Sequence, residues 1–427
     1  MSFPVFLLRR AAGAIAVLAA VQAWAAEPLT LAGAQRLALA RSQALVANDA
    51  AASAARRMAQ AAAQLPDPVL KIGIDNLPLN GPDRFSLTRD FMTMRRIGLM
   101  QELPGAEKRR LRGQRGAQEA LKLQAEREVL RVAVLKDTAL AWLERFYALA
   151  GRELVLRQLE EARLQVQAAE AAYRGAKGSQ ADVFMAQGAV GMLEDKLAQS
   201  ERQAENARVL LARWVGDDAR RLPAGPPAWQ ATEMQQGVTP EHLETHAEVA
   251  VAGAVVRAAQ VDVFLAEADK RPDWTVEATY QQRGSAYSNM VSIGLSVPLQ
   301  LDRGNRQDQE VAARKARVDE ALARYEELLR SQEAEVSVML NDWRSGKERV
   351  ARYTDSLVPL AQQRTAAALA TYRGGKADLA TVLAARRDEL ELRLQALAVE
   401  LETAKAWANL NFISLDHDME PAEGSKP

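Results

Sequence analysis

The sequence contains no cysteine, which excludes disulfide bonds, thiolate metal ligands, cysteine nucleophiles and lipidation of an N-terminal cysteine. Aromatic residues make up only 5% of the chain. A thick globular core is therefore not expected, and the abundance of Ala, Leu, Arg, Glu and Gln favours long helices packed side by side. The formal net charge is zero and there is no basic block. Because nucleic-acid binding needs clustered Lys and Arg, nucleic acid is not expected as a partner.

Long apolar runs are scarce as well. Residues 1–25 have the features of a cleavable signal peptide, because Arg10 precedes an apolar run over 11–21, and Ala23 and Ala25 form a small-x-small cleavage pattern. The alternative is a membrane anchor, although this run is shorter than the ~20 residues that a spanning helix needs. No later run is expected to span as a helix. Any membrane part must therefore consist of strands.

A short turn motif is present twice, at residues 173–183 and 372–382. In both copies the sequence Tyr-Arg-Gly is followed, after one residue, by a lysine. Each copy lies between two long stretches of helical periodicity, and the glycines supply the backbone freedom that ends a helix. Each motif is therefore predicted to be the tip of a helical hairpin. Two hairpins at equivalent positions indicate a tandem internal repeat.

The two predicted repeats are residues 26–216 and 240–413. Each is expected to contain a helix, two strands, a long helix, the tip and a returning helix. The segment 217–239, rich in Pro and Gly, is predicted to be the linker between the repeats. The tail 414–427 is predicted to be disordered, because it is rich in charged residues, Pro and Gly.

The strands are predicted from a change of period after the first helix of each repeat. Leu70, Ile72 and Ile74, for example, alternate with Lys, Gly and Asp, so that one face of the strand is apolar. Each strand has about ten residues, the length that crosses a bilayer with tilt. The predicted strands cover about 69–77, 91–103, 274–283 and 290–301.

The helical stretches are long. Thr30 is predicted to cap a first helix that reaches Gln64, and two longer helices are expected over about 106–173 and 306–372. In both of these, apolar residues recur every seven positions, a spacing typical of coiled-coil packing. Pro359 is expected to kink the second long helix without ending it.

Four amphipathic strands cannot close a barrel, since the smallest outer-membrane barrels have ~8 strands and an open edge in lipid leaves backbone groups without partners. Several chains must then share one barrel. The predicted fold class is mainly α with a membrane β part. The alternative is a soluble two-sheet protein with coiled-coil arms, but it explains neither the strand pair at the same place in both repeats nor the secretion signal.

The duplicated order of elements resembles the TolC family of trimeric outer-membrane efflux ducts, over essentially the whole mature chain. The most specific positions are the opening at 29–39, the Pro-Asp-Pro sequence at 66–68, the strand at 293–299 and the two tips. Three further segments are similar to members that accompany heavy-metal resistance pumps, either cobalt-zinc-cadmium or copper/silver: 73–78, 91–96 and 101–104.

The resemblance implies a passive duct without a cofactor or catalytic activity. A homotrimer would form a 12-stranded β-barrel in the outer-membrane lipid, with four strands from each chain, continued by a long periplasmic α-helical barrel. The implied partners are a periplasmic adaptor (membrane fusion) protein and an inner-membrane pump of the proton-driven resistance-nodulation-division type. Heavy-metal cations are the implied cargo.

The resemblance also implies that the tips dock onto the adaptor and form the periplasmic gate. The implied residues are Tyr173, Arg174, Gly175, Lys177, Asp182, Val183, Tyr372, Arg373, Gly374, Lys376, Asp378, Thr381 and Val382. Turn chemistry explains the glycines equally well, whereas turn geometry does not require basic residues in both copies. Family members often carry aspartates just after the second tip. Here Thr381 and Ala384 stand in those places and Asp378 lies earlier, so an acidic gate is not established by the sequence.

Met92, Met94 and Met100 are predicted to share one strand face. That face is the lumenal one if Gly98 aligns with Gly294, and thioethers suit soft Cu(I). Adaptable packing of a barrel wall is the more ordinary interpretation.

Few other residues suggest chemistry. His242 and His246 are four residues apart on a predicted helix and could share a divalent ion, but neither a cysteine nor a third histidine lies near them. The sequence has no phosphate-binding loop, dinucleotide fingerprint or nucleophile elbow. An enzyme is therefore not expected.

Two other classes of protein stay open. A periplasmic coiled-coil adaptor also uses helical hairpins, but it would need one hairpin flanked by the halves of a lipoyl-like domain, whereas this chain has two hairpins that each carry strands. A coiled-coil scaffold is the other class. Within the duct class, drugs or polypeptides are alternatives to metal ions as cargo.

Overall fold

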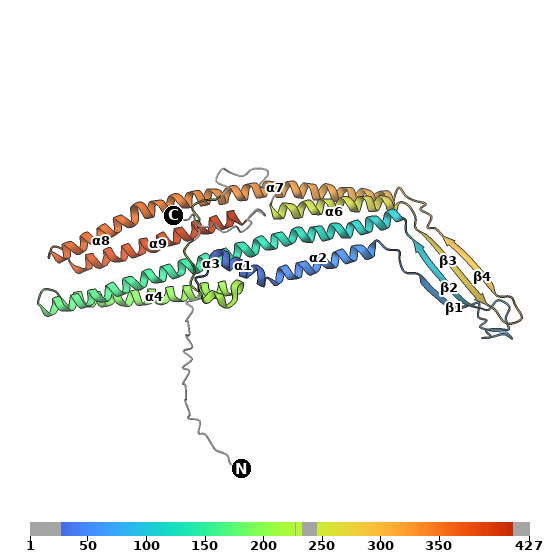
Figure 1. The fold of residues 1–427 in the computed structure, drawn as a ribbon, viewed down its shortest axis with the longest axis horizontal. Helices are drawn as coiled ribbons and strands as arrows, with labels where there is room; N and C mark the ends of the chain where they lie inside the picture. Colours follow the sequence, from blue (N-terminus) through green and yellow to red (C-terminus); the bar gives the residue numbers. More distant parts are fainter. Residues whose placement is uncertain (1–26, 227, 233–245, 413–427) are drawn as a thin grey trace, which may run out of the picture.

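The computed structural model describes residues 27–226, 228–232 and 246–412. The chain forms an elongated wall of helices that ends in a small sheet (Figure 1). The first half contains α1 (Leu31–Arg41), α2 (Gln43–Ala62), β1 (Val69–Asp75), β2 (Met94–Leu103), α3 (Ala106–Arg174), α4 (Gln180–Val215) and η1 (Gly216–Arg220). The second half contains α6 (Ala247–Asp269), β3 (Trp274–Gln282), β4 (Met290–Ser296), α7 (Gln307–Arg352), η3 (Tyr353–Leu357), α8 (Val358–Arg373) and α9 (Leu379–Asn411).

The first helix is broken, although the sequence predicts a continuous one from Thr30 to Gln64. Thr30 does cap it, because its hydroxyl accepts a hydrogen bond from the amide of Gly33 at 3.0 Å. Ser42, however, takes an extended backbone conformation and its hydroxyl caps α2 at the amide of Leu45, 3.4 Å away. A hydroxyl that competes for backbone amides favours such a new start over continuation.

The four strands form one antiparallel sheet in the order β1-β2-β3-β4. All four are shorter than predicted, β3 by only one residue. β1 ends at Asp75, β2 begins only at Met94, and β4 ends at Ser296. Pro298, two residues beyond the end of β4, has no N–H to continue a ladder.

The predicted alternation of apolar and polar residues is confirmed in β1, β3 and β4, whereas β2 carries Arg95 and Gln101 on its apolar face and Met94 and Met100 on its polar face. One row across the apolar face consists of Ile72, Ile97, Tyr280 and Val291. These four side chains are between 44% and 74% exposed, so no described element covers that face. The corresponding row on the opposite face is polar: Lys71, Gly98, Thr279 and Ser292.

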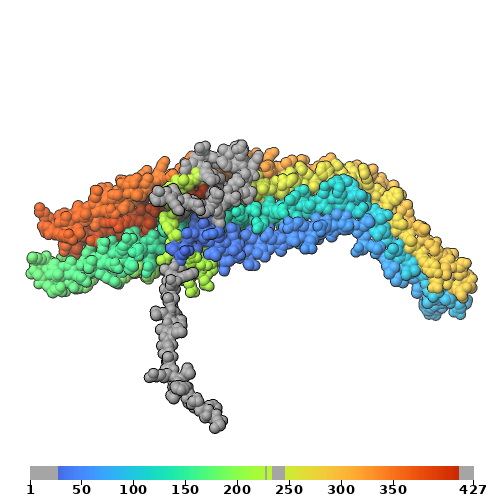
Figure 2. Space-filling model, in the orientation of Figure 1, coloured from blue at the N-terminus to red at the C-terminus, as the bar shows by residue number. Residues whose placement is uncertain are grey.

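The helices form a single layer. Toward the sheet the neighbouring helices lie in the order α2, α3, α6, α7, and toward the tips in the order α4, α3, α9, α8 (Figure 1). The sheet continues this wall at an angle, as Figure 2 shows. One long edge of the wall therefore consists of α2, β1 and α4, and the other consists of α7, α8 and β4. In this single layer, no described helix or strand lies beyond either edge.

The main core lies at mid-length and is closed by chain segments that precede each half. The indole N–H of Trp142 donates to the carbonyl of Leu29, and that of Trp343 donates to the carbonyl of Trp229, both at 2.9 Å. Leu29 in turn donates its amide to the carbonyl of Leu222 at 2.8 Å. The predicted linker is therefore attached to the core at Ala219 and Trp229, which are buried, although most of its other described residues are exposed.

The second long helix continues past Pro359, as predicted, but by way of a π-helical turn. α7 ends at Arg352, the π turn covers Tyr353–Leu357, and α8 begins at Val358. The turn inserts an extra residue before the proline, where the normal hydrogen-bond ladder must be interrupted.

α6 corrects one expectation from the sequence. Among the described helices it alone is long and apolar enough to cross a membrane, although no later run was expected to qualify. Its Ala- and Val-rich sequence explains this, and only 22% of its apolar window is buried within the chain. α6 nevertheless packs between α3 and α7. Asp262 on α6 pairs with Arg115 at 2.8 Å and with Arg314 at 3.4 Å, so α6 belongs to the wall.

Candidate functional site

The two hairpin tips have the same backbone hydrogen bonds. In the first, the amide of Ala176 donates to the carbonyl of Tyr173 at 3.1 Å, and the amide of Lys177 donates to that of Ala172 at 2.9 Å. The second tip repeats both bonds 199 residues later, from Gly375 and from Lys376, each at 3.0 Å. This is the Schellman arrangement that ends many helices. It forms because the last carbonyls of a helix have no partners within the helix.

The residue that needs unusual backbone freedom is not the first glycine of the motif. Gly175 and Gly374 have φ angles of −84° and −78°, which any residue adopts. The left-handed positions are Ala176, with φ 53°, and Gly375, with φ 68°. The first tip therefore carries a backbone cost at Ala176 that the second tip avoids.

Exchanging these residues is expected to change stability in opposite directions. Ala176→Gly is expected to stabilise the first tip by about 1 kcal/mol, and Gly375→Ala to destabilise the second by about 1–2 kcal/mol, because a Cβ is unfavourable at positive φ. Gly374→Ala is the matched control, with little change expected. Chemical unfolding of the detergent-solubilised protein would measure all three. Equal effects at residues 374 and 375 would contradict the assignment.

Each returning helix begins with a hydroxyl and a carboxylate three residues apart. The hydroxyl comes first in α4, and the carboxylate comes first in α9. Ser179 caps α4, where its hydroxyl accepts from the amide of Asp182 at 3.1 Å while the Asp182 carboxylate accepts from the amide of Ser179 at 2.8 Å. Asp378 caps α9, where its carboxylate accepts from the amide and the hydroxyl of Thr381, at 2.9 and 2.5 Å. Three of the implied gate residues thus take part in helix capping: Asp378 as an N-cap, and Asp182 and Thr381 as its counterparts at the third position of their helices.

The cap at Asp378 bears on the question of an acidic gate. Hydrogen bonds from Thr381 lower the pKa of Asp378, so the carboxylate is charged at neutral pH. Because the folded-state pKa is lowered, this contribution to stability is present at neutral pH and is lost as the pH falls through that pKa. Asp378 is negative, but its charge is already engaged by its own helix.

Two of the implied contact residues are buried. Val183 and Val382 are 8% and 1% exposed and belong to an apolar cluster with Ala169, Ala186 and Leu379. This cluster joins the two hairpins just behind their tips. In this arrangement neither valine offers a surface to a partner.

An ion pair also links the hairpins near the tips. Arg386 on α9 pairs with Glu161 on α3, and its side chain is only 17% exposed. Beside it lies a cavity of about 330 Å³, which Tyr372 and Arg373 also line. Sequence reasoning missed Arg386 and Glu161, because they are 225 residues apart and nothing in either motif indicates the other.

The basic residues of the tips are exposed, as the docking interpretation requires. Lys177, Arg373 and Lys376 have no ion pair among the described residues, and Arg174 approaches Glu170 only at 3.9 Å. Tyr173 is 49% exposed. The surface of the tips is therefore basic with one accessible aromatic ring.

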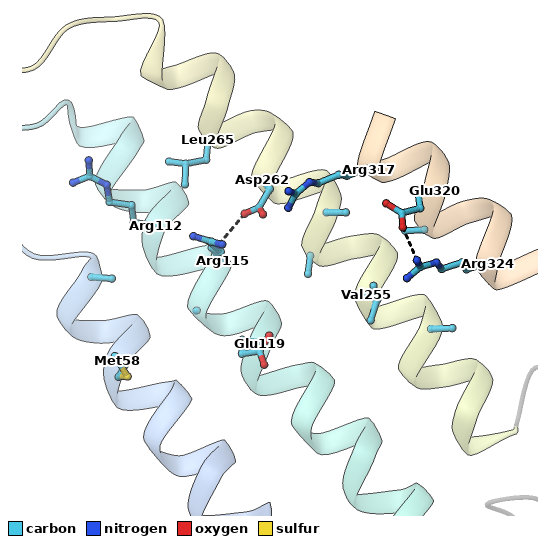
Figure 3. Close-up of a pocket in the computed structure, with 16 residues that line it drawn as sticks. Met58, Arg112, Arg115, Glu119, Val255, Asp262, Leu265, Arg317, Glu320 and Arg324 are labelled. Atoms are coloured by element: carbon cyan, nitrogen blue, oxygen red, sulfur yellow. Dashed lines mark ion pairs between the residues drawn. The ribbon is translucent and has the colours of Figure 1, made fainter. Parts of the chain in front are cut away.

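A larger groove lies in the wall between the tips and the sheet. It has a volume of about 1020 Å³ and is bordered by α2, α3, α6 and α7 (Figure 3). Alanines from α6 line much of it, and Arg115–Asp262 and Arg324–Glu320 form ion pairs at its borders, at 2.8 and 2.6 Å. Its charged lining consists of Arg112, Arg115, Arg317, Arg324, Glu119, Asp262 and Glu320. Charges of both signs create no strong local field for cations or anions.

The candidate metal ligands are not brought together. Met94 and Met100 lie on the polar face of β2, but Met92 precedes the strand and its amide is bound by Asp90 at 2.9 Å. His246 is buried at the start of α6 with both ring nitrogens unpaired, and burial lowers its pKa. His242 lies outside the described residues. Among the described residues there is no cluster of three His, Asp or Glu side chains that could hold a metal.

Comparisons with known proteins give a family match for part of the chain and structural matches for most of it. Residues 238–414 match the family model described as outer membrane efflux protein. No curated protein matches the chain by sequence.

Solved structures match it over most of its length. The outer-membrane channel OprN is 20% identical with a TM-score of 0.73, and 90% of this chain and 89% of that chain are covered. CusC is 15% identical with a TM-score of 0.75, covering 89% and 90%. The open MtrE outer-membrane channel of Neisseria gonorrhoeae is 17% identical with a TM-score of 0.73, covering 90% and 88%. The chain therefore has the fold of outer-membrane channels, and residues 238–414 carry the sequence pattern of the outer membrane efflux protein family.

Proposed function

We propose that this chain is one subunit of a passive outer-membrane channel that serves a tripartite efflux system. The observation that carries this proposal is the uncovered apolar face of the sheet at the end of a helical wall. Apolar side chains on a sheet that has polar residues on its other face are what a membrane strand between lipid and a water-filled lumen requires. The family match of residues 238–414 and the fold likeness support it.

The open edges of the wall support an assembly of several copies. β1 and β4 each have one neighbour in the sheet, so the outer backbone groups of both strands have no ladder partner in the described part of the chain. In lipid, such groups cost several kcal/mol each, and only a closed barrel satisfies them. Three copies would supply the 12 strands of the trimeric barrel that the sequence resemblance implies.

The helical edges carry exposed apolar side chains that suit the same assembly. The helices at one edge of the wall carry Val46 on α2, which is 60% exposed, and Met192 on α4, which is 76% exposed. On the other edge, Val338 on α7 is 58% exposed and Leu360 on α8 is 62% exposed. Contact between opposite edges of neighbouring copies would bury both sets.

The tips would dock onto a periplasmic adaptor, with an inner-membrane pump of the resistance-nodulation-division type as the source of energy. The exposed basic residues of both tips are the surface that the adaptor would contact. Val183 and Val382 would instead hold the two hairpins together.

Heavy-metal cations are the proposed cargo, and this part rests on the sequence resemblance at 73–78, 91–96 and 101–104. Deleting the gene is expected to increase sensitivity to at least one of copper, silver, zinc, cobalt and cadmium, because the duct would be the exit of the system. Growth inhibition over a concentration series, with and without the gene restored, measures this. An unchanged profile for all five metals would remove the metal assignment and favour drugs or polypeptides.

The oligomer is tested separately. In cell fractionation, the protein is expected in the outer-membrane fraction. After purification it is expected to migrate in detergent as an oligomer that heating converts to the monomer. A water-soluble monomer would favour the coiled-coil classes instead of a channel.

A further inference from the structure

An ion pair crosses a strand on the polar face of the sheet. Lys71 on β1 and Glu277 on β3 are not on neighbouring strands, yet the Lys71 ammonium lies 2.8 Å from Oε2 of Glu277. Between them, Gly98 on β2 is in register with both Lys71 and Thr279. A Cβ at Gly98 would lie 2.7 Å from the hydroxyl of Thr279. Because Gly98 has no side chain, the Lys71 side chain can extend across β2 to reach Glu277.

The strand pair β1–β2 of the first half can be aligned, residue by residue, with the pair β3–β4 of the second half. Lys71 faces Gly98 in the first pair, and Glu277 faces Gly294 in the second. Lys71 therefore corresponds to Glu277, and Gly98 corresponds to Gly294.

A second contact checks this equivalence independently. If the strand pairs are equivalent in this way, Arg96 corresponds to Ser292, and Asp75 corresponds to Gln281. Arg96 lies 3.5 Å from Asp75, and the hydroxyl of Ser292 lies 3.4 Å from the side-chain oxygen of Gln281. Both pairs of strands thus make the same diagonal contact.

Because β4 corresponds to β2 and β1 corresponds to β3, the register between β2 and β3 predicts how β4 of one copy would pair with β1 of another. Within the chain, Gly98 faces Thr279. The equivalent residues at the edges are Gly294 on β4 and Gly73 on β1. We propose, on the basis of the proposed oligomeric channel, that β4 of one copy pairs with β1 of the next in the register that sets Gly294 opposite the partner subunit's Gly73. In this register Glu277 reaches over Gly294 to the partner subunit's Lys71.

Both charged groups have capacity for this second partner. Among the described residues, Oε1 of Glu277 has one hydrogen-bond partner, the hydroxyl of Thr279 at 3.3 Å, and the ammonium of Lys71 has three protons of which its own Glu277 uses one. A Cβ at Gly294 would lie no closer than 4.0 Å to another side chain, so the path over β4 is also open.

The consequence is a closed ring of alternating lysine and glutamate around the inside of the barrel, with a glycine under every crossing. The charges are balanced at this level, so the ring joins subunits without giving the lumen a net field. It also fixes the register between copies, because a slip would place carboxylates and ammonium groups opposite the wrong residues.

Cysteine pairs test the register directly, since the natural sequence contains no cysteine. The proposed register sets Ser292 opposite the partner subunit's Asp75, at a separation that a disulfide can bridge. Ser292→Cys with Asp75→Cys is expected to form covalent dimers and trimers on mild oxidation. Ser292→Cys with Gly73→Cys, a pair displaced by two residues on the same face, is the matched control and is expected not to do so.

These experiments distinguish a wrong register from a wrong channel proposal. Cross-linking of the control pair alone, or of neither pair while amine-reactive reagents still trap trimers of the natural sequence, would overturn the register and leave the channel proposal intact. A natural sequence that stays monomeric in detergent would overturn both.

Charge reversal tests the ring. Lys71→Glu would place carboxylates at every position of the ring and is expected to lower the temperature at which the oligomer dissociates in detergent. Adding Glu277→Lys restores the alternation and is expected to recover most of that loss. A Lys71→Glu oligomer as heat-stable as the natural one would contradict the ring.

Discussion

Replacing Gly175 and Gly374 together by phenylalanine is expected to reduce export to the level of a gene deletion while leaving the oligomer intact. Both residues have negative φ angles, and a Cβ would lie 3.4 Å from the nearest atom at Gly175 and 3.5 Å at Gly374, which is ordinary contact. The tips can therefore fold with the larger residues. The bulky rings would nevertheless cover the surface that the adaptor is proposed to contact. Export and heat-modifiable migration would be measured in the same membranes.

The matched control is Gly225→Phe with Gly304→Phe. These glycines are also in open space, with nothing within 4 Å of a Cβ, but they lie away from the tips. The control protein is expected to export normally. Normal export by the tip variant would show that the tips are not the docking site, whereas loss of the oligomer in that variant would show a folding effect instead.

Lys108→Met is expected to destabilise the joint between the sheet and the helical wall by about 1–3 kcal/mol, because Asp273, whose side chain is only 19% exposed, loses its nearest cation and keeps only Arg112 at 3.9 Å. Lys108 lies at the start of α3 and is only 5% exposed. Its ammonium is 2.8 Å from Asp273, which precedes β3, and 3.4 Å from Asp269 at the end of α6. One lysine thus connects elements of both halves where the helices meet the strands.

Arg110→Met provides the comparison for this effect. Arg110 pairs with Glu107 at 2.6 Å on the same turn of α3, but both side chains are 54% exposed. Exposed pairs contribute little because water solvates both charges. Denaturant unfolding followed by circular dichroism would compare the two variants, with partial recovery expected for Lys108→Met combined with Asp273→Asn. Equal losses in Lys108→Met and Arg110→Met would contradict a special role for the buried pair.

Much of the fold follows from local patterns in the sequence. The position of each strand pair, the polar and apolar faces of the strands, the long helices and the two tips were all expected from periodicity and turn residues. These features depend on residues close together in the chain, and a period of two or 3.6 is a property of the local backbone. The ends of elements were less well predicted. Ser42 breaks the first helix and β4 stops at Ser296, because caps and ladder ends depend on individual hydrogen bonds.

At the tips, the structure adds features that the sequence did not indicate. The tip motifs were located, but the glycine emphasised by the sequence is not the residue with positive φ, and Asp182, Asp378 and Thr381 take part in the capping hydrogen bonds of α4 and α9. Val183 and Val382 are buried between the hairpins. A turn motif shows where a chain reverses, but it does not show which of its side chains the neighbouring hairpin covers.

The sequence by itself determined the duplicated order of helices and strands and the two-faced character of the sheet, because these depend on short-range spacing. Only the tertiary structure decided which distant residues meet. The indole of Trp343 on the carbonyl of Trp229, Arg386 on Glu161 and Lys71 on Glu277 each join parts more than 100 residues apart. The last two pairs form because the two halves lie edge to edge in one wall, and the first because the segment before the second half packs back onto α7. These arrangements are set by the summed packing of the chain rather than by any local pattern.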